Sequence, residues 1–181
     1  MSRIQPVDRS TSHDGVSRSF AAVEKQLGVV PNMMRTMAQS PRVLEGYLAL
    51  NAALARGALP AALREEIALA VAEANACDYC LSAHTALGRR AGLSDDQLSD
   101  SREGHASEPE ANAALQFALA VLESRGGVSD DELARIRAAG FSEGEIVEII
   151  AHVALNIFTN YVNRAADTEI DFPKVSAGQF V

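Results

Sequence analysis

Apolar residues recur three and four positions apart along most of this chain, and they rarely alternate with polar residues. This spacing places them on one face of a helix, whereas a half-buried strand needs strict alternation. Alanine and leucine, which both favour helix, are abundant. The pattern therefore predicts an all-α fold, and 181 residues are enough to close a sizeable core as a single domain over residues 1–181.

Prolines, glycines and capping residues mark where the helices should begin and end. A polar N-terminal arm, residues 1–16, is expected to precede helices over about 17–27, between Pro31 and Pro41, and over about 41–56. Residues 61–91 form a predicted dithiol helix pair, with a helix over 61–74 and a second helix that carries 77–91. The capping-box pattern S-x-x-E/Q marks three later starts, at Ser94 with Gln97, Ser129 with Glu132, and Ser142 with Glu145.

A polar stretch, SREGHASEPE at 101–110, is the predicted linker between two helical halves. GLSDDQL at 92–98 resembles GVSDDEL at 127–133, and the fifteen residues from Glu66 loosely resemble those from Glu145. These echoes would fit an internal helical duplication, although short capping motifs also recur by chance.

Both cysteines and one of the four histidines fall within NACDYCLSAHTA, residues 75–86. On a helix, the spacing C-x-x-C-x-x-x-H puts Cys77, Cys80 and His84 on one face. If Asn75 interrupts the preceding helix, both thiols lie in a first turn, where free N–H groups and the helix dipole favour thiolate over thiol. The motif therefore predicts nucleophilic cysteines.

Zinc binding, a structural disulfide and a buried pair of free cysteines are the other uses of such a motif. A structural zinc site needs four ligands, and no second C-x-x-C or H-x-x-x-H supplies the missing one. A structural disulfide is rare in a reducing compartment, whereas buried free cysteines with a satisfied histidine are common in protein cores. We expect a redox-active dithiol, without a bound metal or organic cofactor.

Thiol chemistry at neutral pH also needs a base and a route for its proton. Glu65, Glu66 and Glu73 precede the cysteines in LREEIALAVAEANAC, whose middle is apolar. A glutamate turned toward the core would be desolvated and able to exchange protons, although any one glutamate taken alone is more often a solvated surface residue.

The segment from Glu65 to His84, EEIALAVAEANACDYCLSAH, resembles the signature of the alkylhydroperoxidase D and carboxymuconolactone decarboxylase superfamily, in its dithiol branch. A glutamate lies twelve residues before the first cysteine, and a histidine lies four after the second. Weaker similarity to peroxidase-related members extends over 28–51 and 150–173. The resemblance implies an all-helical domain that assembles into a homo-oligomer, often a trimer or a multiple of trimers, with a dimer as the alternative.

Carried over by position, the resemblance implies that Glu65 and His84 form a proton relay that activates Cys80, with Cys77 as its disulfide partner. It also implies a hydroperoxide substrate and an external dithiol reductant such as a dihydrolipoyl carrier, or a peroxiredoxin partner. Alkylhydroperoxidase D has a histidine where this chain has Tyr79, between the cysteines. That departure leaves open the full relay and the electron donor, and the order in which the two cysteines react is also open.

We therefore expect a thiol-dependent peroxidase or disulfide reductase that acts in oxidative-stress defence through a Cys77/Cys80 cycle. The alternatives are a redox-sensing or adaptor module and, less favoured because it does not need a C-x-x-C pair, a decarboxylase-like lyase. The Met33, Met34 and Met37 group is either core or the wall of an apolar pocket. His152 is interpreted as a satisfied core histidine rather than a base, and 158–173 as closing the pocket or forming an oligomer contact.

Charge and hydropathy narrow the partners and the compartment. The formal net charge is -8, and the basic residues form no cluster longer than GRR at 88–90. Nucleic acid and anionic membrane are therefore not expected partners. The N-terminal residues contain no apolar signal region, and no later window offers about 18 uninterrupted apolar residues. We expect a soluble cytoplasmic protein.

Overall fold

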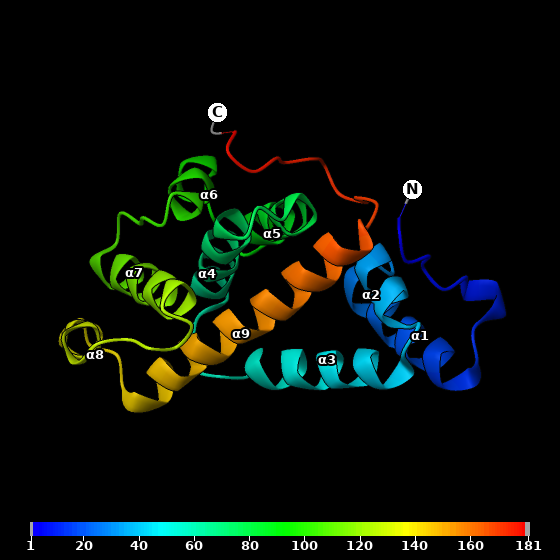
Figure 1. The fold of residues 1–181 in the computed structure, drawn as a ribbon, viewed down its shortest axis with the longest axis horizontal. Helices are drawn as coiled ribbons and strands as arrows, with labels where there is room; N and C mark the ends of the chain where they lie inside the picture. The colour runs from blue at the N-terminus through cyan, green and yellow to red at the C-terminus, as the bar shows by residue number, and fades with distance from the viewer. Residues whose placement is uncertain (1, 180–181) are drawn as a thin grey trace.

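The computed structural model describes residues 2–179, and over this range it contains nine α-helices, one short 3₁₀ helix and no strand (Figure 1). The all-α prediction is confirmed. The elements in chain order are η1 (Arg9–Thr11), α1 (Asp14–Leu27), α2 (Asn32–Met37), α3 (Pro41–Leu54), α4 (Ala61–Ala74), α5 (Asp78–Arg90), α6 (Asp95–Arg102), α7 (Pro109–Glu123), α8 (Asp130–Ala138) and α9 (Glu143–Ala166).

All three predicted capping boxes are present. Ser94, Ser129 and Ser142 each accept a hydrogen bond from the backbone N–H three residues later, and the Gln or Glu there accepts one in return. These reciprocal bonds satisfy donors that a helix start leaves unpaired. They fix the starts of α6, α8 and α9, and the connection between α6 and α7 is residues 103–108.

Helix α4 lies at the centre of the molecule and is buried around most of its circumference. Leu69 and Ala72 belong to a core cluster that contains residues of α1, α2, α3 and α5. Ile67 and Val71 belong to a second cluster, built mainly with α7, α8 and the first half of α9. Because α4 contributes to both clusters, the α4–α5 junction is held rigidly from two sides.

Helix α9 crosses the whole molecule diagonally (Figure 1) and packs against α3, α4 and α7. By length and composition alone, its 24 residues could span a membrane. Its most apolar 18-residue window has a mean hydropathy of 1.2, and 44% of that window is buried inside the protein. Its packing is that of a core helix in a soluble helical domain. The segment from Glu145 that resembles the one from Glu66 continues as one helix, whereas the earlier segment breaks before Cys77.

Glu66 is the glutamate of α4 that faces the core, with 5% of its surface exposed. Burial raises the pKa of its carboxyl above the ordinary value of 4.5. Because the pKa of Glu66 is higher in the folded than in the unfolded protein, the contribution of this carboxyl to the free energy of unfolding is complete only below its ordinary pKa. That contribution is lost as the pH rises through the folded-state pKa.

Replacing Glu66 with glutamine should therefore stabilise the protein at pH 8, by about 1 kcal/mol, and should have little effect near pH 4. Urea unfolding of both proteins across this pH range measures the difference. If the gain in stability were the same at both pH values, it would not come from removing a buried carboxylate charge.

Candidate active site

The chain breaks between α4 and α5 within three residues. Asn75 ends α4, Ala76 adopts a left-handed conformation with φ 48°, and Cys77 caps α5. A non-glycine residue in this region costs about 1–2 kcal/mol, so the surrounding structure must hold it there. One such restraint is the hydrogen bond from the Asn75 side-chain amide to Asn160 Oδ1, 2.9 Å long, which ties the break to α9.

Cys77 and Cys80 are joined as a disulfide at the N-terminus of α5, and both are buried. The sulfur of Cys77 accepts a hydrogen bond from the Cys80 backbone N–H at 3.3 Å. The sulfur of Cys80 accepts one from Nδ2 of Asn163, on α9, at 3.4 Å. Once the bond is reduced, these donors and the positive end of the helix dipole favour a thiolate. The sequence motif gave no indication of Asn163 in this role, because it lies 83 residues beyond Cys80.

Glu65 and His84 form a hydrogen-bonded pair, with Glu65 Oε2 and His84 Nδ1 2.8 Å apart. With a proton on Nδ1, the neutral imidazole presents Nε2 as a proton acceptor. His84 lies one helical turn after Cys80, and both border the same cavity. The arrangement can carry a proton between the Cys80 sulfur and a carboxylate that orients the imidazole.

This cavity, which we call the Cys80 cavity, has a volume of about 260 Å³ and lies between α1, α2, α3, α4, α5 and α9. Glu65, Cys80 and His84 all border it, whereas Cys77 does not. Its apolar lining includes Leu27, Met33, Met34, Leu87, Leu155 and Phe172. Met37 lies in the core instead. The cavity therefore combines a polar reacting centre with a wall suited to an organic molecule.

Tyr47 is a polar side chain of the Cys80 cavity that the sequence did not indicate. Burial, with a smaller effect of the Glu65 carboxylate, raises the pKa of Tyr47 to about 12. Its phenol is therefore a protonated donor at neutral pH. Tyr47 lies on α3, far in sequence from the C-x-x-C motif, and no spacing rule connects the two.

His152 is buried as expected, but the interpretation of it as a satisfied core histidine is wrong for one ring nitrogen. Its Nε2 has no hydrogen-bond partner within residues 2–179, and the side chain, 7% exposed, borders the Cys80 cavity. Burial and the nearby Arg64 guanidinium lower the pKa of His152, which favours the neutral imidazole. This nitrogen is available to a polar group of a bound molecule.

Tyr79, which lies between the two cysteines where alkylhydroperoxidase D has a histidine, has a structural role. Its hydroxyl accepts a hydrogen bond from the Met33 backbone N–H at 3.1 Å, and its ring packs edge-on against Phe172. Burial, together with the Asp171 carboxylate, raises the pKa of Tyr79 far above its ordinary value. The phenol therefore keeps its proton and anchors α5 to the start of α2.

Replacing Tyr79 with phenylalanine should leave the buried Met33 N–H unpaired and destabilise the protein by about 1–2 kcal/mol. Urea unfolding of the variant measures this loss. Tyr161 is exposed on α9, and its replacement with phenylalanine is the matched control. Equal stability of the two variants would show that the Tyr79 hydroxyl contributes nothing.

The C-terminal segment lies across the α4–α5 junction (Figure 1). Backbone N–H groups of Val175, Ala177 and Gly178 donate to Ser82, Asp78 and Glu73, respectively. Glu73 also forms an ion pair with Arg102 at 2.9 Å, so it joins α4 to α6 and to the C-terminal segment. It does not border the Cys80 cavity. Of the stretch 158–173, Phe172 and Asn163 close the cavity, whereas Phe158 and Tyr161 are exposed.

Metal coordination has no geometric support in the part of the chain that the structure describes. Within residues 2–179, no three or more His, Cys, Asp or Glu side chains are grouped so as to hold a metal ion.

Similarity to known proteins extends over the whole fold. Residues 41–124 match the model of the carboxymuconolactone decarboxylase family. An uncharacterized protein of Haemophilus influenzae is 43% identical over 75 residues, which are 41% of this chain and 53% of that relative. The chain thus spans only about half the length of this curated relative.

Two solved structures are similar along nearly the full length of the chain. An uncharacterized peroxidase-related protein with an alkylhydroperoxidase AhpD core, from Ralstonia eutropha JMP134, is 27% identical with a TM-score of 0.85, over 94% of this chain and 92% of that one. The debrominase Bmp8 is 26% identical with a TM-score of 0.79, over 93% of this chain and 91% of that one. A cysteine-to-alanine variant of Bmp8 was solved in complex with 2,3,4-tribromopyrrole.

The family match covers the C-x-x-C helix pair, and the structural similarity covers the remaining helices. Together, the family match and the structural similarity support placing this chain in the alkylhydroperoxidase D and carboxymuconolactone decarboxylase superfamily.

Proposed function

We propose that this protein reduces organic hydroperoxides through a dithiol–disulfide cycle of Cys77 and Cys80. The observation that carries the proposal is that Cys80, joined to Cys77 in a disulfide at the start of α5, borders an apolar cavity that also holds the hydrogen-bonded Glu65–His84 pair. The peroxidase-related protein from Ralstonia eutropha, which has the same fold, supports this proposal.

The oxidative half-reaction starts when His84 accepts the proton of Cys80. The thiolate attacks the distal peroxide oxygen, the O–O bond breaks, and the proton returns from His84 to the departing alkoxide, which leaves as an alcohol. Cys80 is now a sulfenic acid. The thiol of Cys77 displaces water from it and forms the disulfide. Two electrons have passed from two thiols to one peroxide.

The walls of the cavity suggest the substrate class. A volume of about 260 Å³ lies just below the usual range for small-molecule sites. Its methionines and Phe172 favour an apolar organic group over a small polar peroxide. Tyr47 and the unpartnered Nε2 of His152 can each hydrogen-bond a polar atom of that group.

The reductant and the assembly belong to the same proposal. An external thiol reductant restores the dithiol in the cytoplasm, whereas a peroxiredoxin partner takes electrons from the dithiol and does not supply them. A homo-oligomer is supported by an exposed apolar stripe on one face of α9, formed by Val147, Ile150, Phe158 and Tyr161. Replacing Phe158 with glutamate should lower the mass measured by sedimentation if copies meet along this stripe.

The proposed reaction is tested by counting thiols in the reduced protein before and after one equivalent of cumene hydroperoxide. We expect two thiols to be lost and one equivalent of alcohol to form. Loss of no thiol, or formation of alcohol without thiol loss, would disprove the dithiol cycle. Slow turnover with every peroxide, combined with an oxidation-dependent change in oligomer mass, would favour a redox-sensing role instead.

Reductive dehalogenation of a small halogenated heteroaromatic is a second candidate. It is favoured by the structural similarity to the debrominase, whose cysteine variant holds a tribromopyrrole. In this reaction two thiols become a disulfide, a C–Br bond is replaced by C–H, and bromide and a proton are released. Release of one bromide per disulfide from 2,3,4-tribromopyrrole would support this candidate, and absence of bromide would exclude it for that compound.

A further inference from the structure

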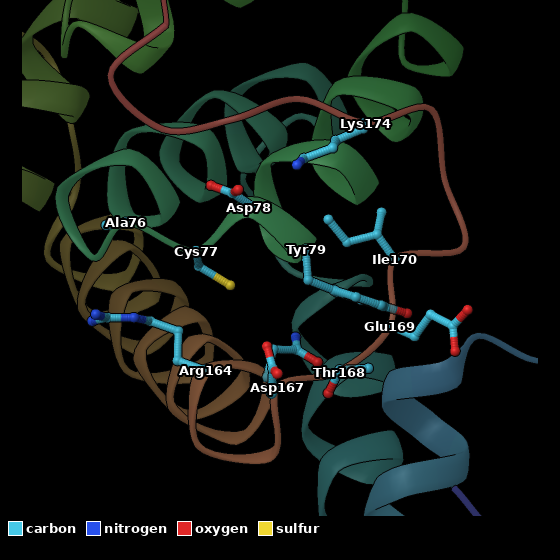
Figure 2. Close-up of a pocket in the computed structure, with 11 residues that line it drawn as sticks. Ala76, Cys77, Asp78, Tyr79, Arg164, Asp167, Thr168, Glu169, Ile170 and Lys174 are labelled. Atoms are coloured by element: carbon cyan, nitrogen blue, oxygen red, sulfur yellow. The ribbon is translucent and has the colours of Figure 1, made fainter. Parts of the chain in front are cut away.

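The disulfide lies between two cavities, and each of its cysteines borders only one of them. Cys80 lines the apolar cavity described above. Cys77 lines a second cavity of about 470 Å³, which we call the Cys77 cavity, formed by the α4–α5 junction, the end of α9 and residues 167–174. Figure 2 shows the Cys77 sulfur pointing into this space. Tyr79 and Asn163 border both cavities and separate them.

This arrangement decides which sulfur an external thiol can attack from each side. In thiol–disulfide exchange the attacking, central and leaving sulfurs lie close to one line, so the attacker approaches from the side opposite the leaving sulfur. An attack on Cys77 with Cys80 as leaving group therefore comes from the Cys77 cavity. The leaving thiolate of Cys80 is stabilised by the amide of Asn163 and by the start of α5.

The Cys77 cavity differs in chemistry from the Cys80 cavity. Its lining carries both signs of charge, with two cations, Arg164 and Lys174, and three acids, Asp78, Asp167 and Glu169. Figure 2 shows these groups around the cavity. Within residues 2–179, no ion pair joins either cation to these acids. A ligand that carries both charges complements such a lining better than an apolar one does.

We propose that the Cys77 cavity is the entrance for the reductant, and that it selects a small thiol carrying both an ammonium group and a carboxylate. This inference rests on the proposed dithiol cycle. The peroxide and the reductant then use separate entrances on opposite sides of one disulfide. The volume of about 470 Å³ lies within the range of small-molecule sites.

The reductive half-reaction balances with two thiols. The thiolate of the first bonds to the Cys77 sulfur, the Cys77–Cys80 bond breaks, and Cys80 leaves as a thiolate. A second thiolate attacks the sulfur of the bound first thiol and releases Cys77 as a thiolate. Two small thiols have become one small disulfide, and the protein has gained two electrons.

The proposal is tested on protein oxidised with diamide, so that no peroxidase activity is needed. Rates of disulfide reduction are measured with glutathione, 2-mercaptoethanol and dihydrolipoamide, each divided by its rate with a model disulfide. Glutathione should be favoured over 2-mercaptoethanol by about tenfold. Iodoacetamide present during the reaction should alkylate Cys80 in molecules that carry glutathione on Cys77, as fragment mass spectra show.

The Arg164→Glu variant tests the charges of the cavity. We expect it to reduce the glutathione/2-mercaptoethanol rate ratio by about fivefold, a ratio that a general loss of structure would not shift. Lys25→Glu, at an exposed position outside both cavities, is the matched control and should keep the ratio.

Three outcomes would overturn the inference: a ratio near one in the unaltered protein, a faster reaction with dihydrolipoamide, or glutathione found on Cys80. Failure of the proposed function is distinguishable from these, because it appears as the absence of thiol loss with hydroperoxide.

Discussion

Replacing Cys80 with serine should lower kcat/KM for organic hydroperoxides by at least about 10³-fold, because the attacking sulfur is removed. Cys80 borders the apolar cavity with His84, and its sulfur accepts a hydrogen bond from Asn163. The serine hydroxyl is nearly the same size but is a far weaker nucleophile toward a peroxide. Alcohol formation from cumene hydroperoxide, with dithiothreitol as reductant, measures the loss.

Replacing Cys77 with serine is the matched control, because it changes the neighbouring cysteine of the same motif. The Cys77→Ser variant keeps the attacking thiol, so it should reduce one equivalent of peroxide and stop at a sulfenic acid, which dimedone labels. The opposite pattern, with a first turnover retained in Cys80→Ser and lost in Cys77→Ser, would reverse the roles of the two cysteines. Activity in both variants would reject the dithiol cycle.

The local sequence predicted those features that depend on residues close together in the chain. The three capping boxes followed from side chains three residues apart, and the bounds of α4 followed from Pro60 before it and Asn75 after it; the structure has them where they were expected. The break at Asn75 also led us to expect both thiols in the first turn of a helix over 77–91, and in the structure Cys77 is the N-cap and Cys80 lies in the first turn of α5. Short-range hydrogen bonds decide such features, so one sequence is enough to show them.

Contacts between distant segments could not be predicted in this way. Asn163, Tyr47 and His152 reach the Cys80 cavity from α9 and α3, and only the packing of these helices brings them there. Helical spacing alone did not distinguish Glu65, Glu66 and Glu73, and only the family resemblance pointed to the first. The structure pairs Glu65 with His84, buries Glu66 and ties Glu73 to Arg102. The direction in which each side chain of α4 points depends on what packs around that helix.

Replacing Glu65 with glutamine should lower the rate of peroxide-driven thiol oxidation by about 10²-fold, the usual size of a general acid–base contribution. Glutamine keeps the shape of the side chain and can still accept a hydrogen bond from His84 Nδ1. It lacks the negative charge that stabilises the imidazolium formed when His84 takes the Cys80 proton. The midpoint of Cys80 alkylation should therefore move to higher pH.

Helix α4 supplies the controls for this prediction, because Glu66→Gln and Glu73→Gln make the same chemical change outside the pair. Both should stay within about threefold of the unaltered rate, since neither carboxylate borders the Cys80 cavity. Because Glu65 and His84 act as a unit, Glu65→Gln combined with His84→Gln should cost about as much as the larger single change. Losses that multiply in the double variant would mean that the two residues act independently, and equal losses in all three glutamate variants would remove Glu65 from the relay.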